Sequence, residues 1–205
     1  MSTHAHVVPT VVVCVFLGLG LPARAGHAEL VWFYGSQFDQ AIPADPEATR
    51  GWMDDATIEV PDHLLIEDLN VTVSLTHTNV FDLQLFLTSP SGTTVLLNAY
   101  DPFTEYFEGA DYQQTVFDDE ADIGIKEATA PFRGWFRPHA DTTLSVFDGE
   151  DAFGDWRLQI YDAYYVNEGQ LDAFGLIVTA TPEPATILFL LTGLGLVGFS
   201  RRRAG

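Results

Sequence analysis

Acidic side chains gather in the middle of the sequence, where their oxygens could bind a metal ion. Asp118, Asp119 and Asp122 lie close together. Carboxylate oxygens suit Ca²⁺, which takes about six to eight oxygen ligands. Other acids at predicted strand ends or in loops could converge on the same ion: Asp82, Asp148, Asp151 and Asp162. We therefore predict a calcium site with Asp118, Asp119 and Asp122 as ligands. A merely solvated acidic surface is the alternative, because no loop has EF-hand spacing.

A second set of residues has the types of a hydrolase triad. His77 and Asp82 could act with one of the serines Ser74, Ser89 and Ser91, because acyl transfer needs a nucleophile, a base and an orienting acid. The sequence has no Gly-x-Ser-x-Gly motif that would place a serine on a strand-turn-helix elbow. We therefore expect no catalytic residues.

Aromatic residues are frequent in the second half of the chain. An exposed strip of them could stack on the apolar faces of sugar rings or form a protein interface, whereas buried ones would form the core. Both readings apply to the same set: Phe132, Trp135, Phe136, Trp156, Tyr161, Tyr164 and Tyr165.

The elements that must position these residues are β-strands. Trp156, Leu158 and Ile160 alternate with Arg157, Gln159 and Tyr161, which is the period of a half-buried strand. The same alternation occurs over residues 71–76 and 83–87. Residues 93–97 and 171–179 are predicted as further strands. Residues 98–130 are acidic and expected to be rich in loops. No amphipathic helix is evident in the body, so we predict an all-β sandwich of antiparallel strands.

Composition limits the classes of partner. The chain has 205 residues and a formal net charge of −20, which leaves room for one self-sufficient domain. Only five of the nine basic residues lie between residues 26 and 180. Because nucleic-acid affinity depends on Lys and Arg contacts to phosphates, we expect no nucleic-acid partner. Cys14 is the one cysteine, so no internal disulfide can form.

Both ends of the chain have the features of targeting segments. Residues 1–25 contain an apolar run and end in Ala23-Arg24-Ala25, which predicts a signal peptide cleaved after Ala25; an uncleaved anchor is the alternative. Near the other end, residues 185–199 are apolar and precede Arg201, Arg202 and Arg203. We predict a hydrophobic transmembrane helix there, with the arginines held in the cytoplasm and the body outside.

The body, predicted to span residues 26–180, resembles the P/Homo B domain that follows the catalytic domain in kexin- and furin-like subtilases. The resemblance implies a jelly-roll β-sandwich of galactose-binding-like type, and it strengthens the calcium prediction, since several members bind calcium. Phe174 stands where the family usually has tryptophan. The landmarks occur in one order: Ile42-Pro43, His77-Thr78, Asp82-Leu83, Ser89-Pro90-Ser91-Gly92-Thr93, Phe117-Asp118-Asp119, Ala130-Pro131-Phe132, Phe147-Asp148-Gly149, Gly154-Asp155-Trp156 and Gly169-Gln170-Leu171.

The tail, residues 181–205, resembles a PEP-CTERM sorting signal. Its three parts are Pro182-Glu183-Pro184, the apolar run and the arginine cluster. The resemblance implies export from a Gram-negative bacterium and transient anchoring in the inner membrane. It also implies processing by an exosortase-type enzyme and delivery to the cell surface or an extracellular matrix.

Together these features predict a non-catalytic, surface-delivered module of the binding or structural class. The partner could be an extracellular polysaccharide. One alternative is an accessory domain for a separate subtilisin/kexin-like serine endopeptidase, and another is a carbohydrate-binding module.

Overall fold

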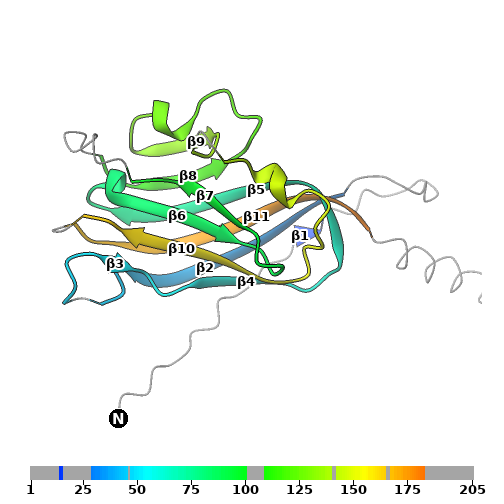
Figure 1. The fold of residues 1–205 in the computed structure, drawn as a ribbon, viewed down its shortest axis with the longest axis horizontal. Helices are drawn as coiled ribbons and strands as arrows, with labels where there is room; N and C mark the ends of the chain where they lie inside the picture. The colour runs from blue at the N-terminus through cyan, green and yellow to red at the C-terminus, as the bar shows by residue number, and fades with distance from the viewer. Residues whose placement is uncertain are drawn as a thin grey trace, which may run out of the picture.

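Two β-sheets face each other and enclose the core of the protein (Figure 1). The structure is a computed structural model that describes residues 14–15, 29–45, 47–100, 109–139, 142–164 and 167–182. The predicted cleavage site at Ala23 and Ala25, the apolar run 185–199 and Arg201 to Arg203 lie outside these ranges. Within the described residues, no helix is long and apolar enough to cross a membrane.

The first sheet has six strands in the spatial order β1-β2-β11-β5-β8-β9. Neighbours are antiparallel except β8 and β9, which run parallel. The strands are β1 (Cys14–Val15), β2 (Glu29–Ile42), β11 (Gly169–Pro182), β5 (Leu64–His77), β8 (Tyr112–Phe117) and β9 (Phe132–Phe136).

The second sheet has the order β3-β10-β6-β7, and β4 also pairs with β10. Its strands are β3 (Gly51–Trp52), β10 (Gly154–Asp162), β6 (Leu83–Thr88), β7 (Thr94–Asn98) and β4 (Ala56–Val60). The described helical segments are short 3₁₀ turns: η1 (Val80–Asp82), η3 (Ile125–Glu127) and η4 (Leu144–Phe147). The predicted all-β sandwich is therefore confirmed.

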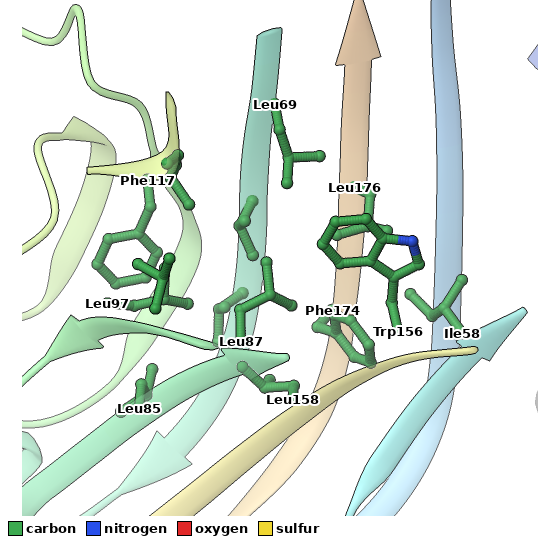
Figure 2. Packing of buried hydrophobic residues seen from close by; sticks show 14 of the residues in the cluster. Ile58, Leu69, Leu85, Leu87, Leu97, Phe117, Trp156, Leu158, Phe174 and Leu176 are labelled. Atoms are coloured by element: carbon green, nitrogen blue, oxygen red, sulfur yellow. The ribbon is translucent and has the colours of Figure 1, made fainter. Parts of the chain in front are cut away.

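The core lies between the sheets because alternate side chains of each strand point inward. Trp156 and Leu158 of β10 face Phe174 and Leu176 of β11 across this interior (Figure 2). The Trp156 ring is fully buried, and its Nε1–H donates to the Ala152 carbonyl at 2.8 Å. Phe174 is also fully buried, so the residue that departs from the family pattern still serves as a core residue.

A glycine opens the strand that carries Trp156. Gly154 has φ +118°, a conformation that residues with a side chain rarely adopt. A Cβ there would also come within 3.0 Å of Pro90 Cβ. The Gly-Asp-Trp landmark therefore places Trp156 by backbone geometry as well as by apolar burial.

Some strands differ from the sequence-based expectation. Residues 29–42 lacked a clean period but form β2, and residues 112–117 of the expected loop region form β8. Gln37, Asp39 and Gln114 have positive φ values, which interrupt the alternation that would have shown these strands. Cys14 and Val15, inside the predicted signal peptide, form β1 and pair with β2.

We expect Trp156→Ala to lower the free energy of unfolding by about 3–5 kcal/mol, because it removes a large, fully buried side chain. Trp135→Ala is the matched control: Trp135 is 52% exposed, so its loss should change stability by less than about 0.5 kcal/mol. Urea unfolding of both variants measures the difference. Equal effects would contradict the assignment of Trp156 to the core.

Candidate functional site

A buried polar cluster lies at the end of the sandwich where β5 and β10 both finish. His77 closes β5 and Asp162 closes β10, and their side chains are fully buried. His77 Nε2 lies 3.4 Å from Asp162 Oδ2, and neither atom has a well-formed hydrogen bond. Asp162 Oδ1 accepts from the Tyr164 backbone N–H at 3.0 Å. Asp162 therefore links β10 both to the end of β5 and to the loop that follows β10.

Asp82 extends this cluster to η1 and to the loop before β11. Its carboxylate accepts hydrogen bonds from the side-chain amides of Asn167 at 2.7 Å and Asn79 at 3.2 Å. Burial raises the pKa of Asp82, and the charge of Asp162 adds to the rise, whereas the Asn167 hydrogen bond opposes it. The cluster thus ties together four segments that are distant in the sequence.

Close packing completes this end of the sandwich. A Cβ on Gly169 would overlap the Thr76 carbonyl oxygen and the His77 ring, so only glycine fits where β11 begins. Open hollows of about 460 Å³ and 290 Å³ lie on either side of the loop that contains Glu168 and Gly169. Their walls offer hydrogen-bonding groups, and His77 lines the smaller one.

The triad considered from the sequence is not assembled among the described residues. Ser74 Oγ accepts from the Gln114 backbone N–H at 3.2 Å. Ser89 and Ser91 hydrogen-bond each other, and Ser91 donates to Glu150 at 2.8 Å. His77 instead contacts Asp162 and the backbone of Asn79. These positions give His77 and Asp82 a structural role, with no serine beside the imidazole.

Asp162→Ala should lower the free energy of unfolding by about 3 kcal/mol, because it leaves the buried His77 ring without its partner and the Tyr164 backbone N–H without its acceptor. The control is Asp155→Ala on the same strand, where the side chain is exposed; a change within about 0.5 kcal/mol is expected there. Chemical denaturation measures both. A loss below 1 kcal/mol at Asp162 would show that the cluster does not hold this end together.

The predicted calcium ligands lie in the segment after β8, where they have separate contacts. Asp119 accepts two backbone hydrogen bonds, from Leu144 and Ser145, each at 2.9 Å. It therefore holds the first turn of η4. Asp118 Oδ1 accepts from the Glu120 backbone N–H at 2.9 Å, as in an Asx turn. Asp122 is exposed to solvent.

Other carboxylates lie near these residues. Burial raises the pKa of Asp68, and the charges of Asp118 and Asp148 raise it further. The pKa of Glu120 is raised by its side-chain hydrogen bond with Asp118, and that of Asp148 by burial and by Asp119. Because the folded state binds these protons more tightly than the unfolded chain, the groups disfavour folding at neutral pH. The penalty is relieved as pH falls through the raised pKa values.

The described acidic side chains of this region are not gathered around one point. In the ranges that the structure covers, no three or more His, Cys, Asp or Glu side chains are grouped so as to hold a metal ion. Both oxygens of Asp119 already accept backbone N–H groups. Asp119 is therefore already used to hold η4, and the calcium ligands remain a prediction from the sequence.

The variant Asp119→Ala distinguishes a residue that holds η4 from a calcium ligand. If Asp119 holds η4, the variant should lose about 1–2 kcal/mol of stability in calcium-free buffer, because two backbone N–H groups lose their acceptor. Thermal unfolding with chelator and with added Ca²⁺ measures this. Asp122→Ala, at an exposed position, is the control. If calcium raised the melting temperature of the parent and not of Asp119→Ala, Asp119 would be a ligand instead.

The predicted aromatic strip divides between the core and the surface. Phe132, Phe136 and Trp156 are buried, whereas Trp135 is exposed. Tyr161 and Tyr164 are half-buried, and Tyr165 lies outside the described residues. Sequence reasoning missed two aromatic residues near this strip: Trp52, which lies beside Tyr161, and Phe86, which lies beside Trp52. Phe86 lay within a predicted strand, but Trp52 lies on a two-residue strand that has no period to detect.

Comparisons with known proteins agree with the two resemblances. Residues 66–178 match the proprotein convertase P-domain, and residues 180–204 match the PEP-CTERM protein-sorting motif. The comparison with curated proteins gives no significant match.

Solved structures of an Aeromonas sobria serine protease are also similar. The protease in complex with its chaperone is 20% identical, with a TM-score of 0.46 over 78% of this chain. The protease alone is also 20% identical, with a TM-score of 0.43 over 87%. The match covers 28% of each protease chain. The P-domain match spans more than half of the sequence and lies within the sandwich, so this chain belongs to the proprotein convertase P-domain family.

Proposed function

We propose that this protein is a non-catalytic P-domain module that is exported, held briefly in the inner membrane by its tail and then delivered to the surface of a Gram-negative cell. One observation carries the proposal: the P-domain match ends at residue 178 and the sorting-motif match begins at residue 180. The sorting motif therefore follows the P-domain directly, as expected if the tail delivers this domain.

The course of β11 supports this arrangement. β11 ends at Pro182, the first residue of Pro182-Glu183-Pro184, and pairs there with Leu64 of β5. Processing by an exosortase-type enzyme near this motif would leave the core strands intact, because the core cluster extends only to Ala180. The residues proposed to act in sorting therefore begin at the end of β11, beyond the last core residue.

A separate subtilisin/kexin-like endopeptidase is the second candidate partner. The family description favours it, since the matched domain is named for proprotein convertases. In this reading the module would stabilise or regulate a protease encoded by another gene. Co-purification of a serine protease with the processed protein would favour it over a role in the extracellular matrix.

The sorting proposal is tested by replacing Pro182, Glu183 and Pro184 together with alanine in a Gram-negative host that carries an exosortase-type enzyme. The parent should appear on the cell surface in a shortened form, whereas the variant should stay full-length in the inner membrane. Cell fractionation and mass spectrometry of the C-terminus measure this. Alanine at Glu168, which is exposed and lies outside the motif, is the control. Normal surface delivery of the motif variant would contradict the proposal.

A further inference from the structure

Three aromatic rings meet on the outer face of the second sheet. Trp52 of β3 lies 4.9 Å from Tyr161 of β10 and 5.8 Å from Phe86 of β6, measured between ring centroids. Trp52 is 53% exposed, and the other two rings are half-buried. Trp52 pairs directly with Tyr161, and Phe86 lies opposite Gln159. We call Trp52, Phe86 and Tyr161 the aromatic face.

The strand period places these rings outside the core. Ile160, next to Tyr161, is fully buried, as are Leu85 and Leu87 on either side of Phe86. Because successive side chains of a strand point to opposite faces, the aromatic face points away from the interior. It therefore exposes apolar ring surface that the fold does not use to fill its core.

A row of polar side chains runs beside the rings. Thr94 and Thr88 share a hydrogen bond of 2.9 Å, and Thr88 Oγ1 donates to Gln159 Oε1 at 3.2 Å. Gln159 Nε2 donates in turn to Asp55 at 3.2 Å, and Asp55 pairs with Arg157 at 3.5 Å. These contacts orient the groups before any ligand arrives, which lowers the entropic cost of binding.

We propose that the aromatic face and its polar row bind an uncharged polysaccharide. The C–H face of a pyranose ring is apolar and stacks on aromatic rings, while its hydroxyls need donors and acceptors at the side. Both features are present on one sheet face. The charges indicate the class of ligand. Asp55 and Arg157 form an ion pair in the row, so their charges offset each other. The whole chain carries a formal net charge of −20. This field opposes polyanions such as nucleic acids and acidic glycans.

The inference deepens the proposed function and rests on it, because a module delivered outside the cell meets such polymers there. The two can fail separately. Correct surface delivery without glycan binding would overturn only the inference about the ligand. Glycan binding by a chain that stays in the inner membrane would overturn only the sorting proposal.

The test uses the full-length chain in a polyoxyethylene detergent, because sugar-based detergents would compete for the site. Isothermal titration with neutral cello-oligosaccharides and manno-oligosaccharides should show binding to at least one, and alginate oligosaccharides should show none. Trp52→Ala should weaken the binding about tenfold, and Tyr161→Ala by a similar factor. Trp52→Phe keeps an aromatic ring and should retain part of the affinity, even if the alanine variant folds poorly.

Trp135→Ala is the matched control, because Trp135 is as exposed as Trp52 but lies on the outermost strand of the other sheet. It should leave the affinity unchanged. Three results would overturn the inference: no binding of either neutral glycan, an unchanged affinity in Trp52→Ala, or an equal loss in Trp135→Ala. A protein bound through Trp52 in place of a glycan would also overturn it.

Discussion

Strand β11 is the element on which the rest of the sandwich depends. It pairs along one edge with β2, from Gly169 to Ala180, and along the other with β5, from Gly169 to Pro182. Its inward residues Phe174, Leu176 and Val178 are fully buried. Without β11, β2 would lose its main partner and the core would lose one wall. Because β11 comes last in the body, the sandwich cannot close until nearly the whole domain has been synthesised.

The buried polar cluster is a second constraint, of the opposite chemical kind. Taking His77, Asp82 and Asp162 out of water costs free energy that their mutual contacts only partly recover. An apolar cluster would cost less, but it could not accept the amides of Asn79 and Asn167 or the backbone N–H of Tyr164. These hydrogen bonds fix how the loops pass one another at this end of the sandwich. We therefore interpret the cluster as a device for specifying the fold.

The strands in which apolar and polar residues alternate regularly could be predicted from the sequence. β5, β6, β7, β10 and β11 were found from alternation and turn residues, and so was the two-sheet class. Strands interrupted by positive φ at Gln37 or Gln114 were missed, because alternation fails there. Spacing alone did not show the contacts of the acidic residues: Asp118, Asp119 and Asp122 are close in sequence, yet Asp119 turns toward η4. The Trp52–Phe86–Tyr161 contact joins three strands, and no single stretch of sequence contains it.

The aromatic face and the start of the tail lie at opposite ends of the sandwich. Tyr161 adjoins Asp162 and the buried polar cluster at the end where β11 begins, whereas the tail leaves from the other end of β11 (Figure 1). β11 spans 14 residues, so these ends lie roughly 40 Å apart. A chain anchored through its tail would hold the aromatic face in the half of the domain farthest from the membrane. The net negative charge of the body would add to this separation, because acidic surfaces and anionic lipid headgroups repel each other. Anchoring through a central strand also leaves no edge strand to be peeled away, so the domain can be tethered at one end while its opposite half stays free to bind.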